Sequence, residues 1–311
     1  METIINIFIF IVLLFLYLHI QSQLRRNEDL EISEMDYSDN ETLQEICDLK
    51  QPLLFQYNNV NKEFIDNVTM DTLFKYETQD IKVKESSDEN LDYILLPFRS
   101  ANSLFISDTK SRYFSDNNNE FIDETGFVAL FDDNNVFLKP ALTVNTKYDF
   151  IIGSGGSTTP LRYHTSCRKF LCVNSGKIHI KMTPWKSRKY LFPVKDFENY
   201  DFLSPVNPWT PQDEYSNEMN KLKFLEFDII GGYVLSIPPY WWYSIKFSNS
   251  KDNLITSFTY DTATSFLTNL PNYFMYYLQQ SNITKIMKKS ADKSKIDVTE
   301  SVDSKDETLI N

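Results

Sequence analysis

Short apolar runs between turn residues are the feature that most limits how this chain can fold. Each run is too short for a typical helix and is bounded by Asn, Asp, Gly or Pro, which is characteristic of β-strands. Many short strands at close spacing predict a sandwich, a barrel or a jelly roll. The stretch FDDNNVF (131–137) has the composition of a hairpin turn. The runs expected as strands are QPLLFQY (51–57), DYILLPF (92–98), SLFIS (103–107), GFVALF (126–131), NVFLK (135–139), YDFIIG (148–153), KFLCV (169–173), KIHIKM (177–182), YVLSI (233–237) and YSIKF (243–247).

The stretch Ala263–Lys289 breaks this β pattern. Its composition and apolar spacing predict a pair of helices packed on the β domain, with Pro271 at a helix start or a kink. The expected fold is therefore mainly β with flanking C-terminal helices, and it extends over residues 49–289.

A nearly continuous apolar run, Thr3–Ile20, begins the chain. Eighteen helical residues span about 27 Å, close to the ~30 Å of a bilayer's hydrocarbon core. A cleaved signal peptide is the alternative, but no basic residue precedes the run and no small-residue cleavage site follows it. We therefore expect residues 1–22 to be a single-pass membrane anchor. Arg25 and Arg26 follow the span, which predicts that the rest of the chain is cytoplasmic.

Two polar segments flank the expected β domain. The segment Asn27–Glu45 is acidic and contains no Lys or Arg, so residues 23–48 are expected to be a solvated, flexible linker. Residues 290–311 are polar and charged and are expected to be a disordered tail.

Charge and cysteine content exclude two classes of protein. The formal net charge of −12 argues against nucleic-acid binding, which requires a clustered basic surface. The three cysteines, Cys47, Cys167 and Cys172, form no C-x-x-C pair and are too few for a disulfide framework. Free thiols in a reducing compartment are the expectation.

The stretch TTPLRYHTSC (158–167) is the candidate for a strand that lines a pocket. Because side chains alternate along a strand, Arg162 and His164 are expected on one face and Leu161 and Tyr163 on the other. The same alternation in KIHIKM places His179 with two lysines on a face that we expect to be in solvent.

Four segments in order resemble the cupin-like JmjC group: GSTTPLRYH, FLCVNSGKIHIKMTP, FLSPVNPWTP and FDIIGGYVLSIPPYWWYSIKF. The resemblance covers about residues 51–260, and the segment Gly232–Trp242 is its most specific part. It implies a double-stranded β-helix, which is a jelly-roll barrel, and in active members an iron- and 2-oxoglutarate-dependent oxygenase. The words TPLRYH and PPYWWYSI are similar to those of membrane-anchored cupin-like proteins of giant DNA viruses, which implies a viral protein in a host or virion membrane.

The resemblance places the group's three metal ligands on Arg162, His164 and Tyr243, and its basic co-substrate residue on Ile178. All of these positions depart from the family pattern. The chemistry of these residues also argues against a metal site. An iron site of two histidines and one carboxylate needs two imidazoles, and arginine does not ligate metal. With His19 in the apolar run and His179 expected in solvent, His164 is the one histidine left. We expect no catalytic residue, no metal and no cofactor.

Two function hypotheses follow. The first is a catalytically inactive cupin, a pseudoenzyme that acts as a binding or scaffold module for a protein or a small anionic ligand. Arg162, His164 and Tyr243 then either line an anion pocket or form a self-satisfied polar core, in which Glu226 or Asp228 is the candidate to neutralise Arg162. The second is an iron/2-oxoglutarate-dependent oxygenase with unorthodox ligands.

Overall fold

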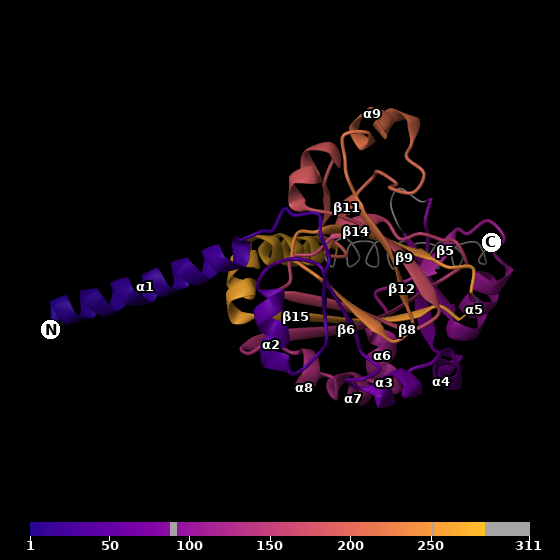
Figure 1. Cartoon of the computed structure of the whole chain (residues 1–311), viewed down its shortest axis with the longest axis horizontal. Helices are drawn as coiled ribbons and strands as arrows, with labels where there is room; N and C mark the ends of the chain where they lie inside the picture. Colours follow the sequence, from indigo (N-terminus) through magenta and orange to yellow (C-terminus); the bar gives the residue numbers. More distant parts are fainter. Residues whose placement is uncertain (88–91, 251, 284–311) are drawn as a thin grey trace, which may run out of the picture. The chain divides into compact units, whose positions relative to one another are not determined.

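The computed structural model describes residues 1–87, 92–250 and 252–283. Over these ranges the chain is mainly β and forms one nine-stranded and one six-stranded sheet (Figure 1). The nine-stranded sheet has the order β1 (Ser33–Met35), β2 (Leu53–Gln56), β13 (Tyr233–Ile237), β8 (Arg168–Ser175), β15 (Leu254–Thr262), β6 (Thr143–Gly153), β5 (Tyr113–Ser115), β3 (Asp80–Glu85) and β4 (Tyr93–Pro97). The six-stranded sheet has the order β10 (Val194–Asp196), β11 (Asp201–Ser204), β7 (Leu161–Tyr163), β14 (Trp242–Phe247), β9 (Lys177–Thr183) and β12 (Leu225–Ile230).

Helices are mostly short and precede or connect the strands.

The chain divides into two compact units, one of Met1–Val194 with Phe202–Thr268 and one of Lys195–Asp201 with Asn269–Asn311. Residues 263–283 form one helix, so the expectation of C-terminal helical structure is confirmed, but the described residues show a single helix where a pair was expected. The other helices are α1 (Glu2–Leu24), α2 (Asn40–Cys47), α3 (Lys62–Asn67), α4 (Met70–Leu73), α5 (Phe98–Ser107), α6 (Asn119–Thr125), α7 (Val128–Asp132), α8 (Asn135–Leu138) and α9 (Ser216–Met219), with 3-10 turns η1 (Phe74–Tyr76), η2 (Trp185–Tyr190) and η3 (Asp213–Tyr215).

The central strands of the nine-stranded sheet are buried on both faces, which explains why they are almost continuously apolar. In β8, Phe170 and Cys172 pack in a core that includes residues of α3, α6 and α7. The alternate residues Leu171 and Val173 pack in a second core with residues of β9 and β14. Figure 1 shows the helices gathered beside β6, β8 and β15. Helices therefore cover one face of this sheet, and the six-stranded sheet covers the other.

The six-stranded sheet has one buried and one partly solvated face. Ile178 and Ile180 of β9 are fully buried, whereas His179 between them is partly exposed. The expected alternation in this strand and the surface position of His179 are confirmed.

Three of the expected strands are helices instead. Residues 103–107 lie in α5, residues 126–131 overlap α7, and residues 135–139 overlap α8. The FDDNNVF stretch accordingly links two helices and is not a hairpin turn. A short apolar run contains too few residues to distinguish the 3.6-residue period of a helix from the two-residue period of a strand. In α5 the buried positions Phe98, Ala101 and Phe105 have helical spacing, but the expected strand at residues 103–107 includes only Phe105.

The expected flexible linker at residues 23–48 is wrong, because most of it is folded. Strand β1 pairs in parallel with β2, and Leu43 of α2 is fully buried. Arg168 Nη2 donates to Asp48 Oδ1 over 2.6 Å and joins the end of α2 to β8. The acidic side chains of this segment mostly face outward, so that high charge and a buried helix face coexist.

The strands described here do not close into a barrel. In the residues with described positions, the nine-stranded sheet ends at β1 and β4 and the six-stranded sheet ends at β10 and β12. The prediction of a mainly β fold is confirmed, and the jelly-roll topology stays a prediction. The expected disordered tail, residues 290–311, lies outside the described residues.

Helix α1 has 23 residues, and its side chains are almost all exposed. By length and composition it is suited to cross a membrane. The expected apolar helix at residues 1–22 is present.

Candidate functional site

The structure places Arg162 and Tyr243 opposite each other on neighbouring strands. Arg162 in β7 and Tyr243 in β14 are register partners in an antiparallel pair. Directly opposed residues project to the same face of a sheet. Tyr243 belongs to the core between the two sheets, and both side chains are buried. Arg162 therefore points inward, as the alternation predicts.

His164 follows β7 and has different partners from Arg162. Its Nε2 lies 2.9 Å from the carbonyl oxygen of Ile237, at the end of β13, so Nε2 carries the proton. Burial and the neighbouring Lys169 cation lower the pKa of His164 to about 3. The imidazole is neutral at physiological pH. Of the three candidate residues, Arg162 and Tyr243 thus face each other, whereas His164 makes its hydrogen bond elsewhere.

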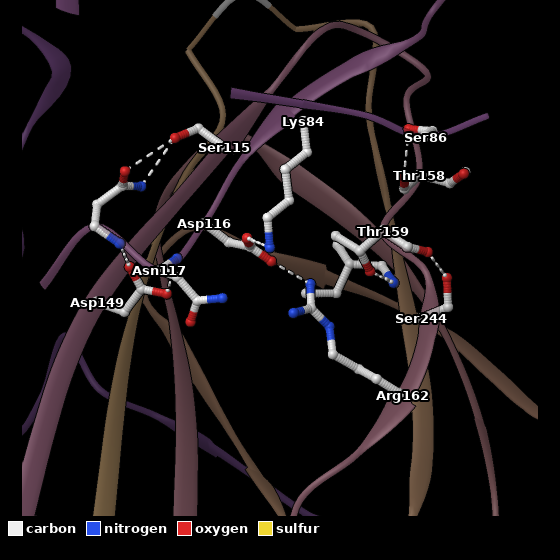
Figure 2. A network of polar contacts seen from close by, with 12 residues as sticks. Lys84, Ser86, Ser115, Asp116, Asn117, Asp149, Thr158, Thr159, Arg162 and Ser244 are labelled. Carbon is white, nitrogen blue, oxygen red and sulfur yellow. Dashed lines mark hydrogen bonds and ion pairs between the residues drawn. The ribbon is translucent and has the colours of Figure 1, made fainter. Parts of the chain in front are cut away.

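The negative group that meets Arg162 is Asp116. Arg162 Nη2 donates to Asp116 Oδ2 over 2.5 Å, and Lys84 Nζ lies 2.9 Å from Asp116 Oδ1. Figure 2 shows the Lys84 and Arg162 side chains both directed at this carboxylate. Asp116 is 1% exposed, and the two cations are also buried. We call Lys84, Asp116 and Arg162 the ion cluster.

Three strands of two sheets position the ion cluster. Lys84 is in β3, Asp116 follows β5, and Arg162 is in β7. The turn after β5 is fixed by Asp149 in β6, whose carboxylate accepts the backbone N–H groups of Asn117 at 2.9 Å and Asn118 at 2.7 Å. These hydrogen bonds hold the backbone that carries Asp116.

The charges of the ion cluster shift the pKa values of two neighbouring carboxyl groups. Burial opposes the charge of Asp116, but Lys84 and Arg162 outweigh it and hold the pKa of this carboxyl well below its usual range. Burial and the Asp116 charge raise the pKa of Asp149. Two cations thus face one firmly ionised carboxylate, and the adjacent Asp149 is the weaker acid.

Such a cluster is poorly suited to bind a metal ion. A buried arginine needs a paired charge, and Asp116 supplies it from within the chain. The Lys84 and Arg162 cations would repel a metal ion placed beside them. Within the described ranges no three His, Cys, Asp or Glu side chains are grouped so that they could hold a metal ion.

The expectation that Glu226 or Asp228 neutralises Arg162 is wrong. Both residues lie on the exposed side of β12 and pair with β9. Glu226 Oε1 lies 3.0 Å from Lys181 Nζ, and Asp228 Oδ2 lies 2.6 Å from Lys177 Nζ. The alternation of β12 places these acids on the solvated face, away from the core between the sheets.

The partners of Arg162 were missed from the sequence. Asp116 lies 46 residues before Arg162, and nothing local in SDNNN (115–119) distinguishes it from a turn residue. The one usable signal is the strand DIKVKE, in which Lys84 follows buried Val83. A lysine in a largely buried strand requires an acid nearby.

Comparison of the chain with models of known protein families found no match, and a search of curated proteins found none either.

Proposed function

We propose that this chain is a membrane-anchored, catalytically inactive module of the cupin-like JmjC type, with a role in binding or scaffolding. Its fold is a jelly roll. Eight strands support this topology, in the orders β6-β15-β8-β13 and β7-β14-β9-β12. Their neighbouring pairs are antiparallel, and successive strands mostly alternate between the two sheets. Two such four-stranded sheets are the pattern of a jelly roll.

The strand pairing also supports the residue correspondence. The resemblance assigns two metal-ligand positions to the β7 region and the third to Tyr243. In the structure Tyr243 and Arg162 face each other across the β7–β14 pair, as ligands of one ion would.

The observation that carries the proposal is the ion cluster at this position. Where active members hold a metal, this chain holds Arg162 bound to its own Asp116, with Lys84 as the second cation. Asp116 takes the place that a bound anion would need. Between the two interpretations of Arg162, the self-satisfied polar core is therefore favoured over an anion-binding pocket.

Anchoring at a membrane is the second part of the proposal. Helix α1 supplies the span, and Arg25 with Arg26 favours a cytoplasmic position for the folded part. The Arg26 guanidinium lies 4.8 Å from the ring centroid of Trp185 and 4.4 Å from that of Tyr240. Arg26, two residues after the end of α1, is therefore docked on the β domain. A host or virion membrane is the location that the viral resemblance implies.

Metal analysis of the purified full chain in detergent tests the proposal. After incubation with Fe²⁺, Mn²⁺ or Zn²⁺, we expect far less than one metal ion per chain, and no difference between wild type and His164→Ala. The matched control is His179→Ala, at the exposed histidine. Stoichiometric metal that is lost in His164→Ala alone would refute the inactive-module proposal and support the oxygenase alternative.

The same preparation distinguishes the polar core from an anion pocket. We expect 2-oxoglutarate and inorganic phosphate to leave the melting temperature of wild type unchanged. A ligand-dependent rise that disappears in Arg162→Met would establish a pocket.

A further inference from the structure

The second compact unit contains an apolar helix face that is exposed among the described residues. The helix of residues 263–283 carries Leu270, Phe274, Tyr277 and Leu278, spaced at i, i+4, i+7 and i+8. Such residues lie on one face of a helix. All four are exposed, Phe274 by 62% and Tyr277 by 68%.

The packing within this unit uses the flank of the helix. Tyr273 stacks on Tyr200 with ring centroids 5.0 Å apart, and Gln280 Nε2 donates to the carbonyl oxygen of Glu198 over 2.7 Å. Lys195 Nζ lies 3.3 Å from Asn272 Oδ1. These contacts fix the rotation of the helix about its axis, with Tyr273 at the edge of the apolar face and Phe274 and Tyr277 exposed.

The composition of this face is that of a membrane-surface helix. Phe and Leu supply apolar area, and Tyr277 presents a ring with a polar tip, which suits the headgroup level of a bilayer. The polar residues Asn272, Gln279 and Gln280 lie outside this face, together with the exposed Met275 and Tyr276. A helix with one strongly apolar face and a more polar remainder lies in the plane of the interface.

The charge pattern of the sequence indicates which surface would attract the helix. Residues 284–295 contain five lysines and one aspartate, whereas the acidic residues of the C-terminus follow after residue 296. Lysines that follow an amphipathic helix in the sequence attract anionic lipids. The same chain carries a helix that is suited to span a membrane.

We propose that the face formed by Leu270, Phe274, Tyr277 and Leu278 binds the surface of an anionic lipid bilayer, as a second membrane contact besides α1. This inference rests on the membrane anchoring in the proposed function and not on the chemistry of the ion cluster. Extraction of membranes with alkaline carbonate measures the anchoring by α1 separately.

Single-cysteine labelling of the full chain in lipid vesicles tests the proposal. Phe274→Cys and the matched control Gln279→Cys each receive an environment-sensitive fluorophore. Wild type measures background labelling, because Cys47, Cys167 and Cys172 are all buried. In vesicles of phosphatidylcholine and phosphatidylserine with brominated acyl chains, we expect the label at 274 to lose most of its fluorescence and the label at 279 to keep it.

Two further measurements complete the test. Replacement of Lys285, Lys288 and Lys289 by Gln, or a change to pure phosphatidylcholine, should reduce the quenching at 274. Unchanged quenching would overturn the assignment to an anionic surface.

If neither label is quenched while carbonate extraction leaves the chain in the membrane, the proposal is wrong and the anchoring stands. Crosslinking of 274 to 274 between copies, without lipid quenching, would instead identify a second copy of this chain as the occupant and would likewise overturn the proposal.

Discussion

The substitution Asp116→Asn removes the carboxylate that lies between two buried cations and keeps the side-chain size. Lys84 Nζ and Arg162 Nη2, which lie 2.9 Å and 2.5 Å from Asp116 Oδ1 and Oδ2, would then each lose this ion pair. Removing one partner from a buried ion pair costs about 3–5 kcal/mol. For a domain of this size that loss lowers the melting temperature by about 6–20 °C.

Urea unfolding of the full chain in detergent, followed by tryptophan fluorescence, measures this loss. Trp241 and Trp242 are buried and report on the β domain. The triple variant Lys84→Met, Asp116→Leu and Arg162→Met is the control, because replacing all the charges by apolar groups should restore much of the stability.

The pH dependence gives the prediction a second, independent measurement. The pKa of Asp116 is lower in the folded state than its unfolded value of about 3.9. Its contribution is therefore complete above that value and is lost as the pH falls through the folded pKa. The difference between wild type and Asp116→Asn should shrink below about pH 4. A difference under about 0.5 kcal/mol at pH 7 would refute the reasoning, since surface substitutions have effects of that size.

Three more substitutions test other contacts. Burial lowers the pKa of His164 to about 3, below its unfolded value of about 6.5, so its contribution to stability is complete above pH 6.5 and falls as the pH drops toward 3; His164→Gln should remove this part of the pH slope in urea titrations. Asp39 accepts the backbone N–H of Thr42 at 2.9 Å as the N-cap of α2, so Asp39→Ala should lower the unfolding free energy, and no effect on it would argue that α2 is not part of the cooperative unit. Glu226 pairs with Lys181 on an exposed surface, so Glu226→Gln should change stability by less than about 1 kcal/mol in the same assay, and a loss comparable to that of Asp116→Asn would contradict the contrast drawn here between buried and exposed ion pairs.

Local sequence patterns predicted the structure correctly where composition or a single periodicity dominated a segment. The apolar run at the N-terminus predicted α1 from composition and length alone. Alternation in KIHIKM predicted which side chains of β9 are buried, and it placed His179 on the outer face. These properties depend on residues that are neighbours in sequence.

Other elements depended on packing that the local sequence does not contain. The apolar runs in α7 and α8 fit a strand as well as a helix, and the core against β6 and β15 decides between them. The acidic segment before residue 49 is folded because Leu43 enters that core and Arg168 reaches Asp48. Neither partner is near in sequence.

The candidate site divides in the same way. Alternation along TTPLRYHTSC determined that Arg162 points inward, because the side-chain period of a strand is a local property. The partner of Arg162 was decided by the tertiary structure, since β3, β5 and β7 meet only when the two sheets pack face to face. A buried charge demands compensation but does not specify which distant residue provides it. In this chain the packing of the sheets selects Asp116.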